Sequence, residues 1–322
     1  MTELMQSELP TVDPRQSSLR GKQIAVTGAD GFIGRHLVRS LIEAGAGRVV
    51  AIDSRPIAST RLPTSSSTFI GAGGRTILEP IDDLLEGIEV VVHLAAQVSP
   101  PKSVKDPLSD ATANVLATVA LLESCRRAGV KRLIYASSAA VYGRPIHLPI
   151  DEEHRTCPES PYGQSKLAAE HYCLLYARLY GLSVVALRYF SVYGPGQPLS
   201  GGYAGVIRLF LDRLDRGLPL QIEGDGSQTR DFIHVSDIAR ANLLATGSSV
   251  EGILNVASGE GITIADVAHL VAGPDYPIEY LPPRLGDIPH SVANVEAAHR
   301  QLGFQTTVSL ADGLADLRKG AS

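Results

Sequence analysis

The chain has 322 residues, of which 44% are hydrophobic and 20% are charged, and its formal net charge is -5. This length suits one large domain or two closely joined ones. The mild acidity argues against nucleic acid or an anionic membrane as a partner. No apolar run approaches the ~20 residues of a membrane span. The sequence has neither an HExxH motif nor a Cys/His cluster that would indicate a metal site.

The polar residues 1–20 lack the apolar stretch of a signal peptide, so we expect a flexible leader. Beyond it, runs rich in β-branched residues alternate with helical patterns. Strands are predicted at 22–28, 48–53, 88–95, 131–138 and 182–190, and helices at 32–45, 116–129 and 162–181. Uninterrupted apolar strands between helices predict a doubly wound parallel α/β sheet, the Rossmann architecture.

The second half of the chain has a different composition. Segments 191–205 and 223–232 are rich in turn residues, and the later elements are shorter. We expect a cofactor-binding domain over 21–189 and a smaller, interleaved lobe over 190–322 that mainly binds substrate, with some segments returning to the first domain. Cys125, Cys157 and Cys173 form no paired spacing, which favours a reducing cytoplasm.

A phosphate-binding turn is predicted where the first strand meets the first helix. In "VTGADGFIG", Gly28, Gly31 and Gly34 allow the backbone to approach a pyrophosphate at a helix N-terminus. Asp53 ends the second strand, where a carboxylate would bind the adenosine ribose hydroxyls and repel a 2′-phosphate. NAD is therefore favoured over NADP, although Arg55 lies close by.

A second motif predicts proton chemistry. Tyr162 and Lys166 are four residues apart on one helical face, and their helix follows a strand that ends in Ser137 and Ser138. We expect the charges of Lys166 and an oxidised nicotinamide to lower the pKa of the phenol, so that Tyr162 can accept a hydroxyl proton. A serine hydroxyl would hold the same substrate oxygen.

These motifs stand together with "HLAA" at 93–96, "RYFSVYGPGQ" at 188–197, "GDGSQTRDF" at 224–232 and "PRLGDI" at 283–288. The chain thereby resembles the NAD-dependent nucleotide-sugar epimerase/dehydratase family of extended short-chain dehydrogenases, over roughly residues 22–318. The resemblance implies that Tyr162 is the catalytic base, Lys166 its partner on the nicotinamide ribose, and Ser138 the hydroxyl beside the sugar's C4 oxygen.

The resemblance also implies two sets of ligand contacts. Those to NAD are Gly28, Asp30, Gly31, Phe32, Ile33, Gly34, Asp53, Leu94, Ala95, Ala96, Tyr162 and Lys166. Those to a nucleotide sugar, a UDP-sugar first among them, are Ser138, Tyr162, Ser191, Arg230, Arg284, Asp287 and Ser291, and the two arginines would hold the diphosphate.

The chain departs from the family pattern at three places. Ser191 stands where many members have an Asn that contacts the diphosphate, and Ala117 replaces a common Gly. Segment 68–80 lacks the acidic residue usually found near the adenine, so we assign no adenine contact there.

The residues after Ser138 distinguish the reaction types of the family. Related 4,6-dehydratases carry acids at these positions, whereas this chain has Ala139 and Ala140, which cannot exchange protons. Elimination without an acid would lose ~10²–10⁴-fold of acid–base catalysis. What remains suffices for reversible hydride transfer at a carbinol carbon.

We therefore predict a 4-epimerase that inverts C4 of a UDP-hexose or UDP-N-acetylhexosamine through a 4-keto intermediate. This intermediate rotates about its diphosphate bonds, so that the hydride returns to the opposite face of the sugar. A UDP-uronate 4-epimerase and an NAD(P)-dependent 4-keto-sugar reductase stay open as alternatives. A cofactor-sensing regulator is a third, but gives no reason to keep Ser138, Tyr162 and Lys166 together.

Two finer expectations follow from the resemblance. Ser291 matches the position that borders the C2 substituent of the sugar, where a large aromatic residue would exclude an acetamido group. The small serine leaves this space open. The apolar helices near 108–128 and 162–181 predict a homodimer, as in the family.

Overall fold

The computed structural model describes residues 19–57, 62, 68–199, 204–283 and 288–319. Its centre is a seven-stranded, fully parallel sheet in the order β10-β6-β5-β4-β1-β2-β3. The strands are β1 Gln23–Thr27, β2 Arg48–Asp53, β3 Phe69–Gly73, β4 Val90–His93, β5 Arg132–Ser138, β6 Ser183–Tyr189 and β10 Gly252–Val256.

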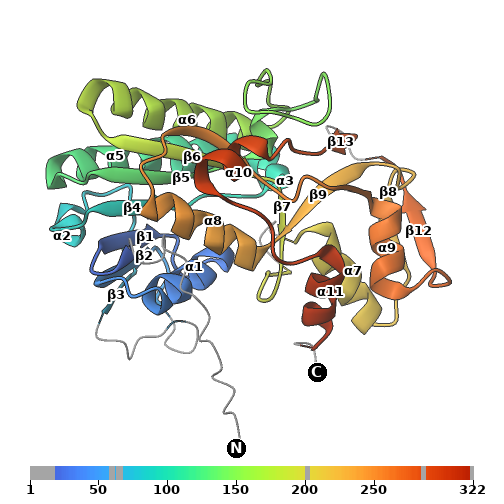
Figure 1. The fold of residues 1–322 in the computed structure, drawn as a ribbon. Helices are drawn as coiled ribbons and strands as arrows, with labels where there is room; N and C mark the ends of the chain where they lie inside the picture. Colours follow the sequence, from blue (N-terminus) through green and yellow to red (C-terminus); the bar gives the residue numbers. More distant parts are fainter. Residues whose placement is uncertain (1–18, 58–61, 63–67, 200–203, 284–287, 320–322) are drawn as a thin grey trace, which may run out of the picture.

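Both faces of this sheet are buried, because side chains along each strand alternate between two hydrophobic cores. In β1, Ile24 and Val26 pack on one side and Ala25 on the other. Helices α1 Phe32–Glu43, α8 Val235–Gly247 and α10 Glu296–Leu302 cover the first face. Helices α2 Asp82–Leu85, α5 Ala117–Ala128 and α6 Pro161–Tyr180 cover the second, as Figure 1 shows. The predicted Rossmann fold is confirmed.

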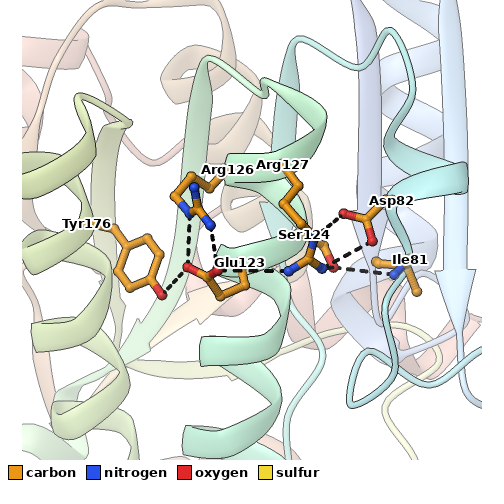
Figure 2. A network of polar contacts seen from close by, with 7 residues as sticks. All are labelled: Ile81, Asp82, Glu123, Ser124, Arg126, Arg127 and Tyr176. Atoms are coloured by element: carbon orange, nitrogen blue, oxygen red, sulfur yellow. Dashed lines mark hydrogen bonds and ion pairs between the residues drawn. The ribbon is translucent and has the colours of Figure 1, made fainter.

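A polar network joins α2, α5 and α6 on the outer side of this second layer (Figure 2). The Glu123 carboxylate accepts hydrogen bonds from Arg126 at 2.9 and 3.1 Å and from the Tyr176 hydroxyl at 2.7 Å. These donors lower the pKa of Glu123 to about 2. The Arg127 guanidinium donates to the Asp82 carboxylate at 2.8 Å, so side-chain contacts join α5 to α2 as well as to α6.

Three helical segments precede α5, whereas the sequence predicts one helix here, given as 116–129 from its pattern and as about 108–128 from the resemblance. They are α3 Pro100–Lys105, α4 Pro107–Ala111 and the π-helical η2 Thr112–Leu116. Ser99 and Asp106 cap the first two, each directly before a proline. The sequence analysis also missed β3, an edge strand that contains two glycines.

The second lobe has its own core around Phe210, Ile222 and Val267. Strand β9 pairs with β7, β11 and β13, and β8 pairs with β12. The elements are β7 Ser191–Tyr193, α7 Val206–Asp215, β8 Leu220–Glu223, β9 Thr229–His234, β11 Gly261–Thr263, α9 Ile264–Ala272, β12 Ile278–Leu281, β13 His290–Ser291 and α11 Leu310–Lys319.

Several segments from the second half of the chain belong to the central sheet and to the helices that cover it. Strand β10 extends the central sheet beside β6, and α8 packs against α1 in the same core. At the other end, Leu19 is buried in this core and Arg20 bridges Ala46, so these two residues belong to the domain and not to the leader assigned at 1–20. No helix among the described residues is long and apolar enough to cross a membrane.

Candidate active site

A cavity of about 830 Å³ opens beside the carboxyl ends of the parallel strands. Its wall brings together Tyr162, Lys166 and all the residues predicted to contact the cofactor, namely Gly28, Asp30, Gly31, Phe32, Ile33, Gly34, Asp53, Leu94, Ala95 and Ala96. These residues come from the ends of β1, β2 and β4 and from the starts of α1 and α6. The topology therefore assembles the whole predicted set in one place.

The glycine turn fits a bound pyrophosphate. A Cβ atom at Gly28, which has φ +68°, would lie 2.8 Å from the Ala95 nitrogen, and one at Gly34 would lie 2.2 Å from the Gly28 oxygen. Gly31 is the N-cap of α1 and makes no side-chain cap, and the first turn carries no acidic residue. The start of this helix therefore suits the charge of a phosphate group.

The carboxylate of Asp53 is held in place at the end of β2. Its Oδ2 accepts a hydrogen bond from the Asp30 amide at 3.0 Å, and its Oδ1 accepts from the Arg55 amide at 3.0 Å. The Arg55 guanidinium bonds the same Oδ1 at 3.4 Å and the Asp30 carbonyl oxygen at 3.1 Å. Because Arg55 is engaged with these acidic residues, the site suits a ribose diol better than a 2′-phosphate.

The start of α6 positions Tyr162. Ser160 caps the helix by accepting from the Gly163 amide at 3.1 Å, and the Ser103 hydroxyl accepts from the Tyr162 amide at 3.0 Å. A Cβ at Gly163 would lie 2.5 Å from the Ala140 oxygen, so the turn after β5 packs directly on α6. This contact brings the Ser138 hydroxyl within hydrogen-bond reach of the Tyr162 phenol. Ser137 lines the cavity, and Ser138 follows it as the last residue of β5.

Burial dominates the electrostatics of this pair. Desolvation raises the pKa of the Tyr162 phenol, and the bond from Ser138 opposes this rise. The Asp110 carboxylate raises the pKa of the phenol further. The lowering expected from Lys166 together with an oxidised nicotinamide depends on the bound cofactor and stays a prediction. Desolvation also lowers the pKa of Lys166 to about 8. The Lys166 ammonium lies 4.6 Å from the centroid of the Tyr135 ring, where a cation–π contact stabilises its charge.

A buried hydrogen-bond chain supports the cavity wall, and the sequence analysis did not identify it. The Ala95 amide donates to the Thr27 hydroxyl at 3.2 Å, Thr27 bonds Nδ1 of His93 at 2.8 Å, and Nε2 of His93 bonds Thr118 at 3.0 Å. Burial lowers the pKa of His93 to about 3, so the ring is neutral and structural. The only sequence signal was the position of His93 in "HLAA".

The wall also includes residues that carry no recognisable pattern. Segment 68–80 was assigned no adenine contact, and Arg75, Thr76, Ile77 and Leu78 of this segment line the cavity. Ala117, which replaces the common Gly, is buried there as well. Further members are Arg35, Gln97, Val98, Lys102, Ala113, Tyr189, Gly196 and Pro198. Within the described ranges, no group of three or more His, Cys, Asp or Glu residues could hold a metal ion.

Three of the predicted substrate residues, Ser191, Arg230 and Ser291, lie in the second lobe. Arg230 on β9 is paired in register with Ser291 on β13, and Ser191 on β7 is paired with Phe232 on β9. A second cavity, of about 860 Å³, is lined by the flanking residues Gln228 and Pro289 and by Arg144 from the loop after β5. Arg284 and Asp287 lie outside the described residues.

Comparison with known proteins agrees with this geometry. The NAD dependent epimerase/dehydratase family model matches residues 24–257. The chain is 39% identical to the UDP-glucose 4-epimerase of Mycolicibacterium smegmatis over 301 residues, which cover 90% of this chain and 95% of that protein.

Two solved structures are also similar. A UDP-N-acetylglucosamine 4-epimerase from Methanobrevibacter ruminantium, in complex with UDP-N-acetylmuramic acid, has a TM-score of 0.86 and 33% identity, covering 94% of this chain and 99% of that one. A UDP-glucose 4-epimerase from Thermus thermophilus, in complex with NAD, has a TM-score of 0.82 and 34% identity, covering 92% and 99%.

Proposed function

This chain belongs to the NAD-dependent epimerase/dehydratase family, and from that premise we propose that it is a 4-epimerase of UDP-hexoses or UDP-N-acetylhexosamines. One observation carries the proposal. The Tyr162 phenol lies in the cofactor cavity, hydrogen-bonded to Ser138, and the two residues that follow Ser138 are alanines. This is a site for hydride transfer in which the two positions after Ser138 offer no acid for elimination.

When NAD is bound, it supplies a reversible hydride acceptor for a carbinol carbon. The amides at the start of α1 would hold its pyrophosphate, Asp53 would hold its adenosine ribose, and Lys166 would hold its nicotinamide ribose. Tyr162 accepts the proton of the C4 hydroxyl and later returns it, while Ser138 holds the same oxygen. We expect the charge of Lys166 and that of an oxidised nicotinamide to stabilise a phenolate and so to oppose the rise that burial causes in the Tyr162 pKa.

Ala139 and Ala140 form the turn η3 Ala139–Val141 and are half-buried directly beside the start of α6. An acidic side chain at either position would lie next to the reacting carbons of a sugar held by Tyr162. Neither alanine can protonate a leaving water or remove a C5 proton. The chain therefore supports inversion and not dehydration.

The sugar nucleotide is assigned to the second lobe. Arg230 has its guanidinium at the β9–β13 edge, where it bonds the Thr229 carbonyl oxygen at 2.8 Å, and it is the proposed partner of the diphosphate together with Arg284 and Asp287. Ser191 is proposed to add a further contact. Ser291, half-buried beside Arg230, leaves room for a C2 acetamido group. The similarity to a UDP-N-acetylglucosamine 4-epimerase supports this substrate range.

The test is to incubate the purified protein with UDP-glucose and with UDP-N-acetylglucosamine, without added cofactor, and to separate the C4 epimers chromatographically. We expect conversion of both. Net change in absorbance at 340 nm with added NAD(H), without isomerisation, would instead identify a 4-keto reductase. Conversion of UDP-glucuronate alone would identify the uronate epimerase.

We also propose a homodimer. Large apolar side chains are exposed along α3, α4, the following π-helical turn and α6, namely Val104, Leu108, Leu116, Tyr172, Leu179 and Tyr180. Such a surface suits an isologous contact with a second copy. A monomer mass in light scattering at micromolar concentration would contradict this assembly.

Finally, we propose a cytoplasmic location. All three cysteines are free: Cys125 and Cys173 are buried, and Cys157 is exposed. Free thiols persist in a reducing compartment. Cell fractionation with an antibody against the protein would test this.

A further inference from the structure

The outer wall of the cofactor cavity is formed by a loop of the second lobe. Loop 194–198 follows β7, and its Gly196 and Pro198 line the cavity together with Gly31, Gly34 and Arg35 from the cradle side. The loop is therefore in contact with the region where the pyrophosphate is assigned. A dinucleotide leaving past the start of α1 would have to displace it.

Two adjacent side chains of α1 hold this loop. The Arg35 guanidinium donates from Nη2 to the Gly196 carbonyl oxygen at 2.9 Å and from Nε to the Gly31 carbonyl oxygen at 3.2 Å. His36 bonds the Pro195 carbonyl oxygen through Nε2 at 3.0 Å, and because a carbonyl oxygen can only accept, Nε2 carries the proton. Both contacts join residues about 160 positions apart in the chain.

The loop is shaped to make these contacts. Gly196 has φ +81°, and a Cβ there would lie 3.2 Å from Nη2 of Arg35. Gly194 has φ +149°, and a Cβ there would lie 2.5 Å from the Val235 side chain. The Gln197 side chain is buried and donates to the Val192 carbonyl oxygen at 3.2 Å. Only glycine at these two positions lets the loop lie flat between α1 and α8.

We propose that Arg35 and His36 act as a clasp that closes loop 194–198 over the cofactor and keeps NAD bound between turnovers. The proposal rests on the proposed function, since an epimerase must return each hydride to the sugar from which it came. A cofactor released in its reduced form would end the cycle. Arg35 and His36 are thus positioning residues that act through the loop, and they touch neither the sugar nor the reacting atoms.

The test measures dinucleotide release instead of turnover. The protein is loaded with NADH, mixed with excess NAD, and followed by the loss of bound-NADH fluorescence. Arg35→Lys keeps the positive charge but loses the planar fork that bonds two carbonyl oxygens, and His36→Phe keeps the ring but loses the donor. We expect each to release NADH about tenfold faster, which corresponds to ~1.4 kcal/mol, about one such hydrogen bond.

The control is Arg39→Gln. Arg39 is exposed one turn further along α1, and it is not among the described residues that line the cavity. Its release rate should equal that of wild type. If Arg35→Lys or His36→Phe does not fold, as judged by its melting temperature without cofactor, Gly196→Ala displaces the loop from the other side and should also release NADH faster.

Release rates within twofold of wild type in all three clasp variants would overturn the proposal. So would fast release in Arg35→Gln together with wild-type release in Arg35→Lys, because charge alone would then retain the cofactor. A wild-type protein that binds no NADH would contradict the proposed function instead, so the two failures are distinguishable.

Discussion

The buried pair Glu170–Arg188 yields the sharpest prediction about stability. Glu170 lies on α6 one turn after Lys166, and its carboxylate accepts from Arg188 of β6 at 2.6 and 3.0 Å. The side chains are 0% and 3% exposed. The same carboxylate accepts from the Ser137 hydroxyl at 2.5 Å, directly beside Ser138. One residue therefore ties α6 to the ends of β5 and β6.

We predict that Glu170→Gln lowers the free energy of unfolding by ~3–5 kcal/mol, because it leaves the buried Arg188 guanidinium without a counter-charge. At roughly 2 °C per kcal/mol for a chain of this size, the melting temperature should fall by ~6–10 °C. Differential scanning fluorimetry measures this shift. Turnover should also fall, since Ser137 adjoins Ser138.

The matched control is Glu123→Gln on α5 (Figure 2). Like Glu170, Glu123 accepts from one arginine and one hydroxyl group, here those of Arg126 and Tyr176. Its ion pair has side chains that are 32% and 44% exposed, so solvent screens it. Such pairs contribute no more than ~1 kcal/mol. Combining Glu170→Gln with Arg188→Met should recover part of the loss, because no charge is then left buried. A Glu170→Gln protein that melts within 2 °C of the Glu123→Gln protein would refute this reasoning.

The remaining predictions concern the site. Tyr162→Phe should lower turnover by at least ~10²-fold with little change in substrate affinity, because only the proton acceptor is lost; wild-type turnover in steady-state assays would disprove its role. The pKa of Lys166 is about 8 in the folded protein and 10.5 normally, so the unfolded chain binds more protons between these two pH values. The free energy of unfolding should therefore rise with pH across that window. Turnover should fall above pH 8, because Lys166 loses its charge there. Comparing melting temperatures and pH–rate profiles with those of Lys166→Met checks both signs; an unchanged stability difference across the window would count against them. Ser291→Tyr should reduce conversion of UDP-N-acetylglucosamine relative to UDP-glucose by ~10-fold or more, as overpacking costs about 1–3 kcal/mol; equal losses on both substrates would show that Ser291 does not border the C2 group.

The parts of the fold that could be predicted are those where one physical requirement acts on many residues together. A strand that is covered on both faces must be apolar along its whole length, so β1, β2, β4, β5 and β6 can be predicted from the sequence. The glycine turn and the spacing of Tyr162 and Lys166 can also be recognised in the sequence, because each depends on local geometry alone.

The parts that were missed depend on neighbours far along the chain. Strand β3 contains Gly71 and Gly73 and is a strand only because β2 pairs with it. Arg75 to Leu78 line the cavity because they follow that strand, and their composition is ordinary. The pKa of Tyr162 depends on such neighbours too, because the charges near it are visible in the sequence and the burial that raises this pKa in the protein is not.

The course of the chain through β10 has a practical consequence for anyone who cuts or fuses this protein. Ending the chain after residue 189 would remove β10. Strand β6 would then be an edge strand with unpaired backbone groups, which promotes aggregation. It would also remove Asn255, which is buried, accepts from the Tyr142 hydroxyl at 2.6 Å and donates to the Ile150 carbonyl oxygen at 2.9 Å. A nucleotide-binding fragment therefore cannot be expressed by a single truncation. The first lobe needs the second half of the chain, which supplies it with a strand and with buried hydrogen bonds.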